Sequence, residues 1–392
     1  MALAPTQGSG RPDLKTPVKI TIEPYTSDRQ AAVRQFNARL APQKLPVYFH
    51  FPERHVPDWL PPKDGLRVYQ EFFLAVDDAA TVRGGYILKT QDFWINGQLR
   101  IVGNLQLPLS EGIVDPRYGF LGVQIVQNAL QRRPLLYSLG MGGLDQPYPR
   151  LLKGLGWALL LVPFYFRIAR PARFLRRMPY VRTTPFRRLS CDVLAWTGLG
   201  WIGAHIAGAW VSRDLPRPSV YEVEKVAGFR DWADEVWEAS RSSYLLTGAR
   251  DARTLEALYS RFYLSGLIVL KLTRRGRAIG WAAVLDTQMS GDRYFGDLRV
   301  GTLVDGFAAP PDAPAVVDAA MRFLTDRGVD LIVSNQAHNA WVAGLKAARF
   351  LQGPSNFAFA VSKPLAEAVA PWEGRWGDFH LNRGDGDGPI NL

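Results

Sequence analysis

The sequence has a single cysteine, and this scarcity excludes two kinds of site. Cys191 has no second cysteine to pair with in its own chain, so an internal disulfide and a zinc site built from several thiolates are both excluded. No grouping of histidine, aspartate and glutamate has metal-ligand spacing, and the closing "RGDGDG" lacks the length and downstream glutamate of a calcium loop. We expect no metal site and a reduced, cytoplasmic setting.

The first twenty residues also lack an apolar run of the length found in signal peptides. We predict a disordered leader over residues 1–16, which ends as the apolar run "VKITIEPY" begins. Export by the usual route is not expected.

Acidic residues are missing between Asp145 and Asp192, and the arginines gathered there supply most of the net charge of +11. The cluster comprises Arg167, Arg170, Arg173, Arg176, Arg177, Arg182, Arg187 and Arg188. No nucleic-acid recognition module accompanies them, so an anionic membrane surface or a phosphorylated ligand fits them at least as well as nucleic acid.

An uncharged, apolar stretch, "VLAWTGLGWIGAHIAGAWV" from Val193 to Val211, follows the arginines. It is short and rich in glycine for a membrane span, and a span would place the two halves of the chain on opposite sides of a bilayer, so we reject that topology. Two interpretations remain. The stretch is either a helix buried between domains, or part of an amphipathic surface element through which residues 167–211 contact an anionic membrane peripherally.

The length of 392 residues suggests two or three domains, and the apolar periodicity repeats one order of elements in both halves. In the first half, strands are predicted over residues 18–25, 69–77, 83–95, 98–109 and 134–142, and helices over 28–40 and 148–157, with a loop that runs into a further helix over 114–130. In the second half, strands are predicted over residues 220–226, 298–308, 329–337 and 356–363, with a hairpin over 267–286, and helices over 229–244, 252–263, 315–327 and 339–351. Asn96-Gly97 and Arg275-Gly276 are the predicted hairpin turns, and Asn339 is expected to cap the last helix.

This pattern predicts an α/β fold of the α+β kind, with two similar domains that each have a mixed, mostly antiparallel sheet flanked by helices. The predicted boundaries are an N-terminal domain over residues 17–160, a basic and apolar connecting segment over 161–217, and a C-terminal domain over 218–370. Residues 371–392 are predicted to form a flexible tail.

The stretch "VDPRYGFLGVQIVQNAL", residues 114–130, places Gly119 and Gly122 between the fourth strand and a helix. This succession resembles the GNAT superfamily of acyl-CoA-dependent N-acyltransferases, in a tandem form with a degenerate second domain. That family has a glycine-rich pyrophosphate loop here, usually written Q/R-x-x-G-x-G/A. Phe120, Leu121 and Gln124 depart from the family pattern. In the second half the resemblance rests on element order and on the closing "FLQGPSNFAFAVSKPL".

Backbone amides at a helix N-terminus can bind phosphate oxygens, and glycine allows close approach. The resemblance therefore implies that an acyl-CoA, acetyl-CoA or another, binds in the first domain. The implied cofactor-binding residues are Leu107, Leu109, Arg117, Tyr118, Gly119, Phe120, Leu121, Gly122 and Val123. The corresponding loop of the second half, "FAAPPDAPAVV", has prolines that remove backbone donors, so we expect no CoA there in the usual way.

The resemblance also implies a carboxylate base near the fourth strand and a tyrosine acid beyond the fifth. Glu111 is the candidate base, with a solvated loop glutamate as the alternative. Tyr148 is preferred over Tyr137 as the acid. Asp305 occupies the corresponding strand of the second half, where a buried carboxylate must be either paired or directed at a substrate amine.

The resulting hypothesis is an N-acyltransferase, with acetyl transfer as the first choice, that acts on a primary amine of a small molecule or of the cell envelope. The alternatives are a non-catalytic binding protein of the same fold and an aminoacyl-tRNA-dependent transferase of tandem architecture, which would give the basic segment a nucleic-acid role. The acceptor, the acyl length and the oligomeric state are not encoded in any motif.

Overall fold

The computed structural model describes residues 19–41, 50–178, 220–260 and 265–387. The predicted leader, the apolar stretch over residues 193–211 and the end of the predicted tail therefore lie outside the described residues. The chain divides into two compact units. The first unit comprises residues 1–55, 73–86 and 107–125, and the second comprises 56–72, 87–106 and 126–392.

The strands and helices follow the predicted order closely. The strands are β1 (Ile20–Pro24), β2 (Tyr69–Asp77), β3 (Val82–Ile95), β4 (Gln98–Ser110), β5 (Leu136–Leu139), β6 (Ala158–Leu161), β7 (Phe164–Ile168), β8 (Glu222–Val226), β9 (Leu246–Gly248), β10 (Ile268–Arg274), β11 (Arg277–Gln288), β12 (Arg299–Ala308), β13 (Leu331–Asn335), β14 (Leu351–Gly353), β15 (Ala358–Val361) and β16 (Phe379–His380). The helices are α1 (Gln30–Leu40), α2 (Leu121–Arg132), α3 (Pro147–Gly154), α4 (Pro171–Arg177), α7 (Asp231–Ser240), α8 (Ala252–Tyr259), α9 (Ala313–Asp326), α10 (Asn339–Ala347) and α11 (Lys363–Ala368).

The strands form two mixed sheets flanked by helices, which confirms the predicted fold class. One sheet has the order β1-β2-β3-β4-β5-β15-β6, with β9 and β16 attached through β3, and the other has the order β14-β7-β13-β12-β11-β10-β8. Pairing is parallel between β4 and β5 and between β12 and β13, and antiparallel at most other positions. Both predicted hairpin turns have positive φ at two successive residues, +46° and +85° at Asn96-Gly97 and +50° and +78° at Arg275-Gly276, as a tight type I′ turn requires.

The first unit is built around β1, α1 and the ends of β2, β3 and β4. β1 pairs antiparallel with the second half of β2, from Pro24 opposite Phe73 to Ile20 opposite Asp77. Helix α1 buries Val33, Phe36 and Leu40 at helical spacing, so one apolar face holds it in place.

Within the second unit the two halves of the chain exchange one strand each. β15 is inserted between β5 and β6, antiparallel to both. β7 is inserted in the same way between β13 and β14. The closing strand of the second half therefore completes the first half's sheet, and a strand from the predicted connecting segment completes the other sheet.

Two predicted boundaries are corrected by this exchange. Residues 161–217 are not only a connector, because β7 lies inside a sheet. Residues 371–392 are not simply a flexible tail, because residues 376–385 include β16 and two short 3-10 turns, and Phe379, Leu381 and Asn382 are fully buried. A sequence pattern cannot reveal such an exchange because a strand's periodicity does not specify which sheet it joins.

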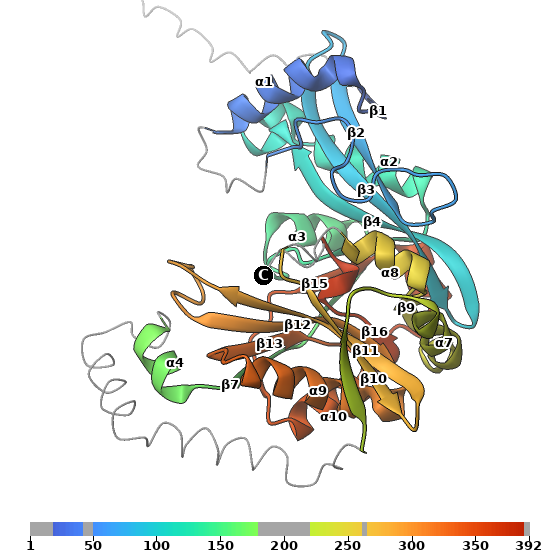
Figure 1. The fold of residues 1–392 in the computed structure, drawn as a ribbon. Coiled ribbons are helices and arrows are strands. Elements are labelled where there is room, and N and C mark those ends of the chain that lie inside the picture. Colours follow the sequence, from blue (N-terminus) through green and yellow to red (C-terminus); the bar gives the residue numbers. More distant parts are fainter. Residues whose placement is uncertain (1–18, 42–49, 179–219, 261–264, 388–392) are drawn as a thin grey trace, which may run out of the picture. The chain divides into compact units, whose positions relative to one another are not determined.

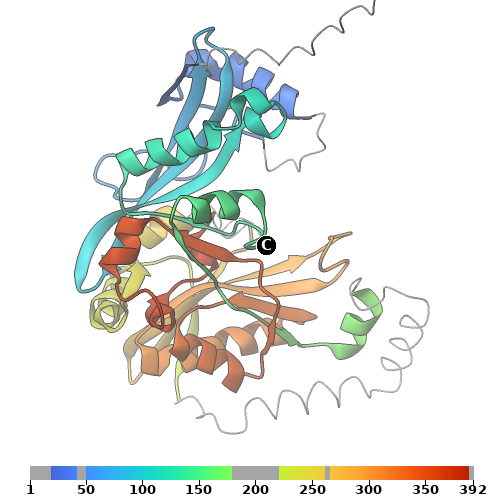
Figure 2. The same ribbon diagram turned by 180° about the vertical axis from the view of Figure 1, so that it is seen from behind.

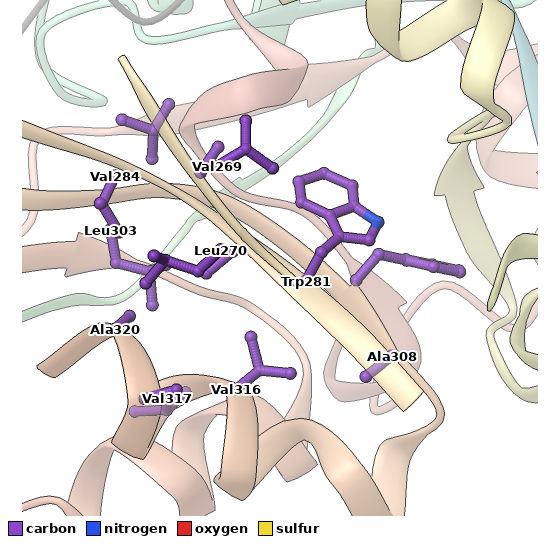
Figure 3. Packing of buried hydrophobic residues seen from close by; sticks show 14 of the residues in the cluster. Val269, Leu270, Trp281, Val284, Leu303, Ala308, Val316, Val317 and Ala320 are labelled. Atoms are coloured by element: carbon purple, nitrogen blue, oxygen red, sulfur yellow. The ribbon is translucent and has the colours of Figure 1, made fainter. Parts of the chain in front are cut away.

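The largest hydrophobic core lies on both faces of the second sheet. Helices α9 and α10 lie side by side along one face, in the view of Figure 1 and from behind in Figure 2. Val316, Val317 and Ala320 of α9 face the strands, while Trp281 projects from the opposite side (Figure 3). There its indole packs edge-on against Phe229, with ring centroids 4.9 Å apart. Burial on both faces makes this sheet the rigid scaffold of the second unit.

Candidate functional site

The parallel pairing of β4 with β5 stops early. Only Gly103 with Leu136 and Asn104 with Tyr137 are in register, although β4 continues to Ser110. The carbonyl of the next residue, Leu105, accepts a hydrogen bond from the Ser138 hydroxyl at 2.8 Å. The two strands therefore separate just beyond Asn104. The Ser138 side chain donates to the first carbonyl of β4 that has no partner on β5.

A hydrogen bond with Ser138 holds Tyr148 at the place where β4 and β5 separate. The two hydroxyl oxygens are 2.9 Å apart. Because Ser138 donates its one hydrogen to Leu105, Tyr148 must donate to Ser138, which leaves the phenol oxygen able to accept a further hydrogen bond. Burial raises the pKa of the Tyr148 hydroxyl well above its usual range, so the tyrosine is protonated. The hydroxyl of Tyr137 instead donates to the Asp385 carbonyl at 2.7 Å and is buried, so it is committed to the interior.

In the first unit, β4 changes conformation just before the predicted loop. Leu107 has φ of +46°, an uncommon value for a residue other than glycine, and Leu109 is buried. Further along the chain, the Asp115 carboxylate accepts one hydrogen bond from the Arg117 amide and another from the Arg117 guanidinium. Both ends of the ion pair are close to solvent, so Arg117 could exchange this partner for a phosphate at little cost.

The loop before α2 leaves three amides without acceptors. The Gly119 amide donates to the Pro116 carbonyl, and those of Val123 and Gln124 donate to the Phe120 carbonyl. Within the described part of the chain, no acceptor faces the amides of residues 120–122. The Phe120 side chain is 83% exposed and the Leu121 side chain is buried, so neither covers these amides. The two departures from the family motif thus leave the donors accessible. The Tyr118 ring is buried beneath Arg83 and shapes the loop from inside.

Glu111 is neither solvated nor unpaired. Its carboxylate accepts from Arg39 at 2.9 Å and from Arg83 at 3.1 Å, and the residue is 4% exposed. The two guanidiniums together donate to both carboxylate oxygens. Glu111 as a general base stays a prediction, and this geometry suits a structural ion cluster better.

Asp305 belongs to a buried ion network in the second unit. Arg250 donates to both Asp305 and Asp385, at 3.1 and 3.0 Å, and all three residues are at most 2% exposed. Tyr259 and Asn382 also donate to Asp305, each at 2.7 Å. Of the two outcomes expected for this carboxylate, the structure shows the paired one, so Asp305 has no free oxygen to direct at a substrate amine.

The loop before α9 lacks the donors that the loop before α2 has. Pro310, Pro311 and Pro314 carry no amide hydrogen, and the amides of Asp312 and Ala313 both donate to the Ala309 carbonyl. Asp312, at the same helix end, adds a negative charge and pairs with Arg274 at 2.7 Å. This geometry supports the prediction that the second half does not hold a pyrophosphate.

The predicted cap of the last long helix is wrong by one residue. His338, not Asn339, is the N-cap of α10, and its Nδ1 accepts from the Ala340 amide at 3.1 Å. Burial lowers the pKa of His338 to about 4, so the ring is neutral and can accept. Histidine is an uncommon cap, and the usual preference for asparagine misplaced the helix start.

Three polar residues of the second unit were missed from the sequence: Lys89, Gln106 and Asp387. Lys89 is fully buried in β3, and its ammonium donates to the Gly386 carbonyl at 3.1 Å. Burial lowers the pKa of Lys89 to about 8. A lysine inside the apolar run "YILKTQDFWI" was the available signal, because a charge in a buried strand needs a partner. The partner is the closing "RGDGDG", which had been assigned to a flexible tail.

The basic cluster is described only in part, up to residue 178. Within that part Arg167 donates to the Ala348 carbonyl at 2.6 Å and Arg177 to the Asp297 carbonyl at 3.3 Å. These arginines therefore also serve the fold. Among the described helices, none combines the length and the apolar character needed to cross a bilayer.

No protein-family model matches the chain, and no curated protein matches it. The solved structures similar to it include the N-myristoyltransferase of Saccharomyces cerevisiae with bound myristoyl-CoA, at 11% identity and a TM-score of 0.49 over 89% of this chain and 84% of that one. A GCN5-related N-acetyltransferase from Anabaena variabilis has 8% identity and a TM-score of 0.49, over 87% and 72% of the two chains. A probable N-acyltransferase from Enterococcus faecalis has 10% identity and a TM-score of 0.47, over 89% and 73%.

Proposed function

We propose that this protein is an acyl-CoA-dependent N-acyltransferase that acylates a primary amine. The observation that carries the proposal is the row of three unpaired amides, residues 120–122, at the N-terminus of the twelve-residue helix α2. Such amides, together with the positive end of the helix dipole, bind phosphate oxygens well. The same loop carries the sequence resemblance to the pyrophosphate-binding loop of the GNAT superfamily.

The residues fit a nucleotide thioester in two further respects. Arg117 stands beside the free amides with its guanidinium accessible, and can supply a mobile positive charge for a phosphate. β4 parts from β5 beyond Asn104, which leaves backbone groups of β4 without a strand partner on that side. A bound acyl-CoA would supply an acyl group already activated as a thioester.

Tyr148 is assigned the role of general acid. Its hydroxyl is protonated and is held by Ser138 at the place where β4 and β5 diverge. Protonation of the departing thiolate prevents the reverse attack and speeds the collapse of the reaction toward amide. Acetyl-CoA remains the first choice of donor and a cytoplasmic setting the expected one.

The partners named from the sequence remain proposals. The acceptor is an amine of a small molecule or of the cell envelope, and residues 167–211 are proposed to contact anionic membranes peripherally. A flotation assay at low salt with vesicles rich in phosphatidylserine tests that contact. Vesicles that float without the protein would refute it.

A thermal-shift titration with acetyl-CoA and with longer acyl-CoAs tests the proposed function. We expect saturable stabilisation that is lost in Gly119→Phe. An added Cβ at Gly119 meets only the Pro116 carbonyl oxygen, at 3.2 Å, so the variant should fold while its ring covers the amides. Gly154→Phe is the matched control, because a Cβ there meets nothing within 4 Å. A folded protein that responds to no acyl-CoA would overturn the proposal.

A further inference from the structure

The carboxylate of Asp387 is held in a fixed position by two glutamines. Gln106 of β4 donates its amide nitrogen to Asp387 Oδ1 at 2.7 Å. The Gln70 amide nitrogen donates to Gln106 Oε1, also at 2.7 Å, and both glutamines are buried. Because Gln70 donates to the oxygen of Gln106, the nitrogen of Gln106 faces the C-terminal segment, where it donates to Asp387 and also to the Gly386 carbonyl at 3.4 Å.

The backbone that carries Asp387 is anchored just as firmly. The Asp385 carbonyl accepts from the Tyr137 hydroxyl at 2.7 Å, and the Gly386 carbonyl accepts from Lys89 at 3.1 Å. The Asp385 side chain is bound to Arg250 in the buried ion network. Because these hydrogen bonds are buried, they hold the backbone of the segment in place. The side chain of its last described residue, Asp387, therefore has a defined position.

One oxygen of this carboxylate is available. Among the described residues, Oδ1 accepts from Gln106 and no group is placed to donate to Oδ2, while the residue is exposed. The titratable groups that face it are Lys89 of β3, Tyr137 of β5 and Asp385 of its own segment. The residue keeps exposed surface, but the groups packed around its carboxyl exclude part of the water there, which raises the pKa of Asp387, and the nearby Lys89 opposes that rise. A carboxylate with a raised pKa is a stronger base than one in water.

Asp387 and Tyr148 are anchored to consecutive residues of one strand. Gln106 holds Asp387 directly, and the carbonyl of Leu105 holds Tyr148 through Ser138. The proposed acid and an accessible carboxylate are therefore held by the same short stretch of β4, at the point where its pairing with β5 ends.

We propose that Asp387 binds the ammonium group of the acceptor and removes its proton. This inference rests on the proposed function and gives that reaction its base, in place of the ion-paired Glu111. A proton passes from the ammonium to Asp387 Oδ2, and the freed amine forms a bond to the acyl carbon. The carbon–sulfur bond breaks, the sulfur takes the proton of Tyr148, and the nitrogen releases its second proton to solvent as the amide forms. Transfer of the Asp387 proton through solvent to the phenolate restores both groups.

The test measures thiol release from acetyl-CoA and longer acyl-CoAs, with a glycine-terminated peptide, glucosamine and spermidine as amines, from pH 6 to pH 10. Asp387→Asn should lower kcat/KM by about 100-fold or more at neutral pH. The defect should shrink toward high pH, where the amine is already unprotonated. Asp387→Glu should recover part of the rate. Asp78→Asn, at an exposed aspartate, is the matched control.

The outcomes separate the two proposals. If the wild-type protein releases no thiol with any pair of substrates, the proposed function fails and this inference fails with it. If the wild type is active and Asp387→Asn keeps its rate, only the role of Asp387 is overturned. An equal loss at every pH, together with a loss of acetyl-CoA stabilisation in the thermal shift, would show a structural role and would also overturn it.

Discussion

Two parallel strand pairs of this protein, β4 with β5 and β12 with β13, begin alike and end differently. In each pair a serine on the second strand donates to a leucine carbonyl on the first: Ser138 to Leu105 at 2.8 Å, and Ser334 to Leu303 at 3.2 Å. Two residues further along the first strand, β4 has Leu107 with φ of +46° and β12 has the buried Asp305. At this position the two strands of the first pair have separated, whereas in the second pair a buried ion network occupies the corresponding position.

The helix starts that follow these strand pairs differ in the same sense. α2 begins with unpaired amides and α9 begins with prolines and a carboxylate. In the first half the serine of the second strand is hydrogen-bonded to Tyr148. In the second half the corresponding serine accepts from the Gln336 amide nitrogen at 3.4 Å. The comparison teaches that polar groups at corresponding positions have free hydrogen-bonding capacity in the first half and are paired with one another inside the second.

The largest expected effect follows from breaking the closed strand pair. Arg250→Met removes the only cation bound to both Asp305 and Asp385 in the described network, and leaves two carboxylates buried without compensation. We expect the free energy of unfolding to fall by about 3–5 kcal/mol in urea denaturation. Arg322→Met, which removes an exposed pair with Asp318, should cost at most about 1 kcal/mol. Equal losses in the two variants would contradict the view that the network closes this half.

The next largest effect distinguishes the role of Ser138 from that of Ser334. Ser138→Ala and Ser334→Ala each remove one hydrogen bond to a leucine carbonyl in a buried strand and should each destabilise the fold by about 1–3 kcal/mol. Only Ser138→Ala should also slow thiol release from acetyl-CoA, because only Ser138 holds a tyrosine. Tyr148→Phe should slow it by about 100-fold while leaving acetyl-CoA binding intact. If Ser334→Ala slowed the reaction as much as Ser138→Ala, the functional difference between the halves would be refuted.

Local signals predicted most elements of both halves, because periodicity and turn residues act within a few residues. The Asn96-Gly97 and Arg275-Gly276 turns and the limits of β2 were found in this way. The exchange of β7 and β15 was not predictable, since an exchanged strand keeps its own local pattern. The sequence also led to Glu111 as a base and to Asp305 as a candidate catalytic residue for one reason: a carboxylate in or just after a strand gives the same sequence pattern whether or not arginines pair with it.

The candidate site was only partly predictable for a related reason. The loop at residues 119–122 is contiguous, so its glycines identified it. Asp387, Gln106 and Lys89 are far apart in the sequence and meet only when the C-terminal segment folds back into the second unit. The "RGDGDG" stretch was excluded as a calcium loop and then given no other role, although its Gly384 packs so closely against Tyr259 and Asp305 that a Cβ would not fit.

The effect that is smallest at neutral pH concerns the two helix starts beyond the paired strands, Tyr148 in the first half and His338 in the second. Burial lowers the pKa of His338 to about 4, below the ordinary value of about 6.5 in the unfolded chain. The unfolded state therefore binds the extra proton first. The stability that the neutral ring contributes is fully present above pH 6.5 and is lost as the pH falls toward 4, by at most about 1.4 kcal/mol per pH unit.

His338→Asn should keep the cap of α10 and flatten this dependence, as measured by urea denaturation between pH 4 and pH 7. His380, whose pKa burial lowers well below its usual range, leaves a remaining slope in the variant. Tyr148→Phe is the matched change in the first half and should leave the slope unaltered, because a tyrosine with a raised pKa does not titrate in this range. An unchanged slope in His338→Asn would mean that the second half tolerates a charge at its helix start, and would remove the physical basis for treating it as the closed copy.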